Sequence, residues 1–155
     1  MRSTLRAGAV LVAGLGLALM AAAAPPPGAI QLQPDAVSWN PASAAMPPGT
    51  QIAVLEGDPK AQRFFTIRLK VPAGSRLAPH WHPRDERVTV ISGSVQVGFG
   101  DAIDEAATAK FAAGGFYVNP ANSHHFVLFP EDSVVQVTGI GPWEINFLTF
   151  SAPAQ

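Results

Sequence analysis

Two histidines and a glutamate within residues 74–93 share one parity, which constrains the fold more than any other feature of the chain. The positions of His80, His82 and Glu86 differ by even numbers, so in an extended segment their side chains leave the same face of the backbone. Two residues of strand span about 6.5–7 Å from Cα to Cα, a distance that two rings leaning toward each other can close onto one metal ion. One face of a strand is therefore expected to carry two imidazoles and a carboxylate.

A third imidazole is available further along the chain. All 4 histidines fall in two short clusters, and the second cluster is the pair His124 and His125. Neighbouring residues of a strand point to opposite faces, so only one of this pair can join the first cluster.

The spacing of these residues resembles the two motifs of the cupin superfamily. The first motif is matched at every fixed position: Gly74, five residues, His80, one residue, His82, three residues, Glu86, six residues and Gly93. The second is matched more loosely: Gly114, five residues, Pro120, one residue, Asn122, two residues and His125. Asn122 stands where the family usually has Gly, and Phe129 stands where it often has Asn. The exchange at Asn122 is mild, because Asn tolerates the left-handed turn conformation.

The resemblance implies a metal site and selects its ligands. It assigns His80, His82, Glu86 and His125 as ligands of one divalent transition metal ion, and it turns His124 to the opposite face. Residues 57–59, 79–90 and 139–143 are also similar to small bacterial cupins that resemble the cupin domain of ChrR-like anti-sigma factors. That group has no agreed activity.

The pattern of residues 51–155 predicts an all-β fold. Phe65, Ile67, Leu69 and Val71 alternate with polar residues, which is typical of a half-buried strand. Short strands end in Gly and Pro throughout, and no long amphipathic helix is predicted. These features favour a single-domain antiparallel double-sheet jelly-roll barrel. Parity places Val88, Val90 and Ser92 inward, and the expected pocket walls are Phe65, Ile67, Val88, Val90, Phe99 and Phe116.

The chain before residue 51 divides into two expected segments. Residues 1–23 have two arginines, an uncharged apolar run and then alanines, which is the layout of a secretory signal peptide. Residues 24–50 are rich in proline and are expected to form an extended arm. The mature protein is therefore expected in the periplasm or outside the cell, with no membrane attachment after cleavage.

The charge and composition of the chain limit the classes of molecule that it is expected to bind. With 10 basic and 11 acidic side chains the net charge is −1. The chain therefore lacks the excess of basic residues that binding to nucleic acid or to an anionic membrane requires. A small-molecule ligand or substrate remains, and outward-pointing Trp81 suits packing under the arm or in a homodimer interface. The chain has no cysteine, so its core and any bound metal must hold it together without disulfides.

Two function classes remain open. Three imidazoles and one carboxylate suit Fe, Mn, Ni, Co or Zn as a divalent ion. The first class is a metal-dependent oxidoreductase of the dioxygenase kind that acts on a small organic molecule, with Glu86 as the catalytic group. The second is a non-catalytic module that binds or senses a small molecule through the same metal.

Export gives the first testable prediction. The mature chain should be about 22–24 residues shorter than the sequence, the length expected of a secretory leader. Mass spectrometry of periplasmic material would reveal this, and an intact Met1 terminus would refute the leader.

Overall fold

The computed structural model describes residues 23–148. Nearly all of the expected leader, residues 1–22, lies outside the described residues, as do residues 149–155. Two one-turn 3-10 helices, η1 (Pro34–Ala36) and η2 (Glu105–Ala107), are the only helices among residues 23–148. No helix in this part of the chain is long and apolar enough to cross a membrane.

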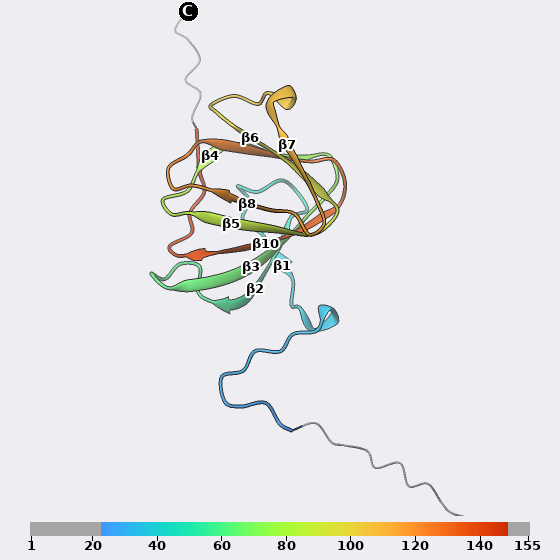
Figure 1. The fold of residues 1–155 in the computed structure, drawn as a ribbon, viewed down its shortest axis with the longest axis vertical. Coiled ribbons are helices and arrows are strands. Elements are labelled where there is room, and N and C mark those ends of the chain that lie inside the picture. The colour runs from blue at the N-terminus through green and yellow to red at the C-terminus, as the bar shows by residue number, and fades with distance from the viewer. Residues whose placement is uncertain (1–22, 149–155) are drawn as a thin grey trace, which may run out of the picture.

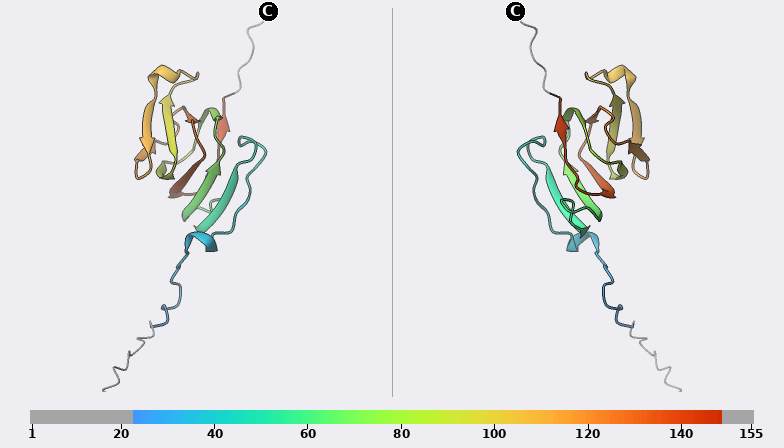
Figure 2. Two further views of the ribbon diagram at one scale, coloured as in Figure 1. Left: turned by 90° about the vertical axis from the view of Figure 1, so that its right-hand side faces the viewer. Right: turned by 90° about the vertical axis from the view of Figure 1, so that its left-hand side faces the viewer.

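The strands form two facing antiparallel sheets (Figures 1 and 2). In spatial order the larger sheet contains β1 (Asn40–Pro41), β2 (Gln51–Gly57), β3 (Phe64–Val71), β10 (Ser133–Ile140), β5 (Glu86–Ser92) and β8 (Phe116–Asn119). The smaller sheet contains β11 (Asn146–Phe147), β4 (Ser75–Trp81), β9 (His125–Phe129), β6 (Ser94–Phe99) and β7 (Ala109–Ala112). The predicted all-β, single-domain antiparallel double-sheet jelly roll is confirmed.

Alternating side chains build the core between the sheets. In β3 the buried residues are Phe65, Ile67, Leu69 and Val71, as the sequence pattern predicts. Their neighbours across the pairing with β10 are Gly139, Val137, Val135 and Ser133 in the same order, and all of these are buried. Because each inward-facing residue of β3 lies opposite an inward-facing residue of β10, the larger sheet presents a continuous, mainly apolar face to the smaller one.

Three predicted inward orientations are wrong, those of Ser92, Phe99 and Phe116. Phe99, at the end of β6, is 58% exposed. Ser92 is exposed and not inward, because the pairing of β5 with β10 shifts register just before it, where Val134 lies opposite Ser92 but Val135 opposite Val90. Phe116 is 56% exposed, because β8 turns its other face inward.

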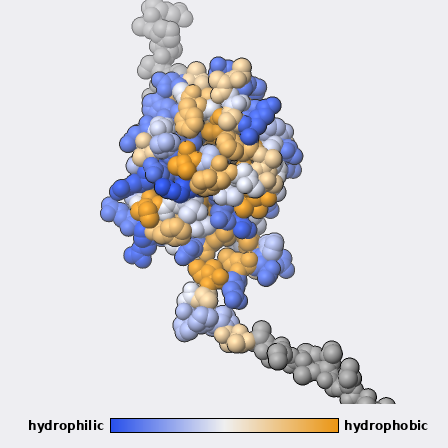
Figure 3. All heavy atoms as spheres, viewed as in Figure 1, coloured by the Kyte–Doolittle hydropathy of each residue, from blue (hydrophilic) through white to orange (hydrophobic). Residues whose placement is uncertain are grey.

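The chain before β2 is partly built into the barrel. Residues 23–33 are exposed and lead away from the body (Figure 1). From there on, Val37 and Met46 are buried, and β1 pairs with β2. The ammonium group of Lys70 lies 4.5 Å from the ring centroid of Trp39, a cation–π contact that fixes this segment against β3. On the face shown in Figure 3, apolar and polar residues are interspersed.

A segment after β10 crosses from the larger sheet to the smaller one, and we call residues 141–148 the strap. Its start is tied to the turn after β2 by the Trp143 amide, which donates to the Pro59 carbonyl at 2.7 Å. Its end pairs with β4 through β11, and the Leu148 amide donates to the Pro79 carbonyl at 3.0 Å. The strap thus links the sheets at the end of the barrel where β4 ends and β5 begins.

Candidate metal centre

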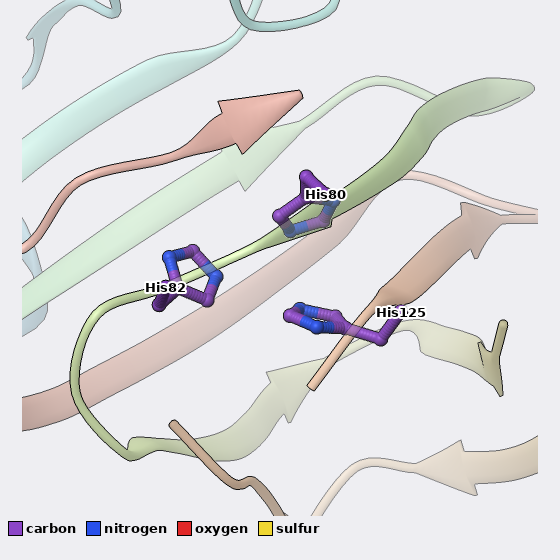
Figure 4. A group of neighbouring side chains, drawn as sticks. All are labelled: His80, His82 and His125. Atoms are coloured by element: carbon purple, nitrogen blue, oxygen red, sulfur yellow. The ribbon is translucent and has the colours of Figure 1, made fainter. Parts of the chain in front are cut away.

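Three histidines from the smaller sheet converge between the two sheets. His80 lies in β4, His82 directly follows that strand, and His125 begins β9 opposite His80. All three are almost completely buried, with exposures of 1%, 2% and 0%. One ring nitrogen from each lies within 4.8 Å of the others, and Figure 4 shows the rings directed toward a common centre.

Main-chain carbonyls fix the orientation of each ring. Nδ1 of His80 donates to the Ala78 carbonyl at 2.7 Å and Nδ1 of His125 donates to the Ser123 carbonyl at 3.0 Å. Nδ1 of His82 donates to the Glu144 carbonyl, in the strap, at 2.6 Å. A carbonyl can only accept, so each Nδ1 carries a hydrogen, and in the neutral ring each Nε2 keeps a lone pair. The histidines are therefore arranged as metal ligands usually are.

The unused nitrogens fit a metal ion. Nε2 of His82 and Nε2 of His125 are buried and have no hydrogen-bond partner. Leaving such a group unsatisfied costs about 1–3 kcal/mol, and a divalent ion would satisfy both nitrogens together. Imidazole nitrogens of this kind suit the borderline divalent transition metals.

Glu86 faces the histidines from the larger sheet, so the expectation that one strand face carries it together with His80 and His82 is wrong: residues 82–85 separate β4 from β5. Oε2 of Glu86 lies 3.3 Å from Nε2 of His82 and 3.8 Å from Nε2 of His125, although it is not part of the group of atoms that all lie within 4.8 Å of one another. Each of its oxygens receives a hydrogen bond: Trp143 Nε1 donates to Oε1 at 3.0 Å, and Asn119 Nδ2 donates to Oε2 at 2.9 Å. The carboxylate is therefore held facing the histidines.

Asn119 and Trp143 are the site residues that the sequence reasoning missed. Asn119 lies opposite Glu86 in the pairing of β5 with β8, so only knowledge of that strand pairing could have identified it. Trp143 belongs to the strap, and its indole ring stacks on His82 with ring centroids 5.8 Å apart and planes at 15°. No motif spacing indicated this contact.

The remaining expectations concern the turn before β9. Asn122 has the left-handed φ of 61° that its place in the motif requires. His124 points away from the centre, and its Nδ1 lies 2.6 Å from Oδ1 of Asp101. The side chain of Glu144 is exposed, so only its main-chain carbonyl serves the site.

Burial and the Glu86 charge set the protonation of the site. Burial, helped by repulsion from His125, lowers the pKa of His80 to about 4, and burial also lowers the pKa of His125. Burial opposes protonation of His82 too, but the adjacent Glu86 carboxylate outweighs it and raises the pKa of His82. For Glu86, burial favours the neutral acid, but His82, His125 and Asn119 outweigh it and lower its pKa to about 2. Of the three converging histidines, His82 is thus the first to take up a proton when no metal is bound.

A small apolar cavity adjoins the ligands. Its volume is about 30 Å³, and Val88, Tyr117, Val127 and Trp143 are among its walls. Of the other expected walls, Phe65, Ile67 and Val90 are buried but do not line it. Phe116 is replaced there by Tyr117, its inward neighbour, and Phe99 is 58% exposed at the end of β6.

Two antiparallel sheets that enclose three histidines and a carboxylate define the cupin class of barrel. Within that class, the model of the ChrR cupin-like domain matches residues 27–144, and the chain belongs to this family.

Several known proteins are similar to this chain. Germin-like protein 3-1 of Oryza sativa subsp. japonica is 38% identical over 68 residues, which are 43% of this chain and 30% of the relative. The polyketide cyclase RemF of Streptomyces resistomycificus superposes with a TM-score of 0.64 at 17% identity, over 78% of this chain and 86% of its own. A candidate acetylacetone dioxygenase of Methylibium petroleiphilum PM1 superposes with a TM-score of 0.60 at 25% identity, over 77% of this chain and 80% of its own. The chain thus spans less than a third of the curated relative and most of the two structures.

The neighbouring histidines of β9 allow a matched test of the ligand set. His125→Ala should abolish tight binding of a divalent ion, because it removes one of the three converging nitrogens, whereas His124→Ala should leave binding within a few fold of the parent. Calorimetric titration with Zn²⁺ or Co²⁺ measures both. Equal loss in the two variants would show that the wrong histidine has been chosen.

The pKa pattern predicts how proton competition depends on pH. Coordination requires neutral imidazole. Of the three converging histidines only His82 has a pKa raised above 6.5, while His80 stays neutral down to about 4. Metal affinity should therefore fall as pH drops through the pKa of His82, with release of about one proton per bound ion. Titration in buffers of different ionisation enthalpy counts these protons. Affinity that does not change between neutral and mildly acid pH would argue against histidine ligands.

Proposed function

We propose that this chain is a metal-dependent oxidoreductase of the dioxygenase type that acts on a small organic molecule outside the cytoplasm. The observation that carries the proposal is the buried set of three convergent imidazole nitrogens with a fixed carboxylate opposite them. His80, His82, His125 and Glu86 would hold one ion of Fe, Mn, Ni, Co or Zn.

The protein groups around the site have distinct roles in this proposal. A bound divalent ion supplies Lewis acidity and a binding position for an oxygen atom of the substrate. Glu86 balances part of the ion's charge, and its Oε2 can accept a proton from a substrate. Trp143 and Asn119 keep that carboxylate oriented. The apolar walls exclude water, which strengthens every charge interaction inside.

The comparisons support this proposal at the level of the fold. Proteins named as an acetylacetone dioxygenase candidate and as a polyketide cyclase share the architecture. A shared fold hosts many activities, so the support for the reaction comes from the site and not from those names.

A second candidate function is a non-catalytic module that binds or senses a small molecule through the metal. The volume of the cavity at the ligands, about 30 Å³, favours it, because that space admits only about two water molecules. Metal would then stabilise the fold and no turnover would occur.

Glu86→Gln separates the two functions. The amide keeps the shape of the side chain but loses the charge, so three histidines should retain most of the metal while oxygen uptake falls by a factor of about 10² or more. Oxygen-electrode assays of iron-loaded and manganese-loaded protein with small phenols, thiols and keto acids provide the measurement, and metal analysis confirms loading.

Glu56→Gln, at an exposed position of β2, is the control. If Glu86→Gln keeps both metal and full turnover, Glu86 has no catalytic role. If no substrate is oxidised and the variant changes only metal affinity and thermal stability, the binding module is the correct function.

A further inference from the structure

A second cavity lies directly beside the one at the metal ligands. The inner cavity, of about 30 Å³, has no room for an organic substrate. The second, which we call the outer pocket, has a volume of about 280 Å³. Its rim carries the exposed residues Ser43, Ala45 and Lys60, so it is open to solvent.

The two cavities share one wall. Met46, Leu69, Trp143 and Ile145 border both of them. A molecule in the outer pocket is therefore separated from the metal ligands by single side chains. Trp143 forms part of this wall and also donates its hydrogen bond to Glu86.

The members of the shared wall differ in how freely they can move. Trp143 is held by Glu86 and by stacking on His82, and Leu69 is fixed within β3. Met46 lies in the loop between β1 and β2, and its unbranched side chain has three rotatable bonds. Met46 is therefore the side chain that can swing aside with the least disturbance.

The composition of the outer pocket defines what it can bind. Apart from Ser43 and Lys60 at the rim, its walls are side chains of Ala, Met, Ile, Leu, Pro and Trp. Its volume is just below the roughly 300 Å³ at which pockets for drug-sized molecules begin. A small, mainly apolar molecule matches both properties.

We propose that the outer pocket is the substrate subsite, which binds the apolar body of a small neutral molecule while its oxygen donor reaches the metal ligands past Met46. This assignment rests on the proposed function for the role of the metal. None of the residues that line the pocket is one of the four metal ligands, so its ligand class can be tested separately.

The probe is 4-fluorophenol, followed by ¹⁹F NMR on the mature chain. Zinc-loaded protein should bind it saturably, and cobalt-loaded protein should relax the fluorine signal much more strongly, since the paramagnetic ion lies behind the shared wall. Ala45→Trp, which fills the pocket from its exposed rim, should weaken binding at least tenfold with zinc affinity unchanged. Ala44→Trp is the matched control, because Ala44 is exposed and does not line this pocket.

Each outcome bears on the assignment. Equal probe binding by the parent and Ala45→Trp, or no binding at all, overturns the subsite, and equal relaxation in the zinc and cobalt forms overturns the route to the metal. If Ala45→Trp does not fold, as judged by its melting curve, Ala45→Leu replaces it. If Ala45→Trp weakens probe binding but the protein oxidises no substrate, the outer pocket is supported as a binding site and only the proposed reaction is refuted.

Discussion

The buried negative charge of Glu86 is the interaction on which the rest of the structure depends. A carboxylate removed from water costs several kcal/mol unless other groups compensate it. Here the compensation comes from three places: Asn119 in β8, Trp143 in the strap and the His82 ring after β4. Because these elements belong to different sheets and to the segment between them, one charge ties the barrel together at this end.

Hydrogen bonds to the main chain also explain why the three histidine rings keep the orientation that a metal site requires. Their Nδ1 atoms are occupied by main-chain carbonyls, and one of those carbonyls, that of Glu144, also belongs to the strap. Phe147 of the strap pairs with His80 across β4 and β11, with ring centroids 5.6 Å apart. The strap therefore contacts His80, His82 and Glu86. The same segment thus orients the site residues and closes this end of the barrel.

Strand parity and motif spacing account for most of what could be predicted from the sequence. Parity placed His80 and His82 on one face correctly, but it also placed Glu86 on that strand face, whereas Glu86 begins β5 in the other sheet and faces the histidines across the barrel. The motif resemblance nevertheless selected Glu86, and it selected His125 over His124. Parity failed where it needed information about a partner strand. Ser92 is turned outward by a register shift against β10, and the choice between Phe116 and Tyr117 depends on how β8 meets β5. Asn119 and Trp143 were missed for the same reason, since their contacts span 33 and 57 residues.

The position of the strap also has a kinetic consequence. Contacts that join distant parts of a chain form slowly, because the intervening loop must close first. The larger sheet already needs such a contact, for example the bond between Arg68 and Gln136 across 68 residues. The strap contacts that orient Glu86 and His82 close loops of similar length, 57 and 62 residues. Tight uptake of a metal ion at this site would therefore require the same slow long-range closures as the barrel, and its rate would report on them.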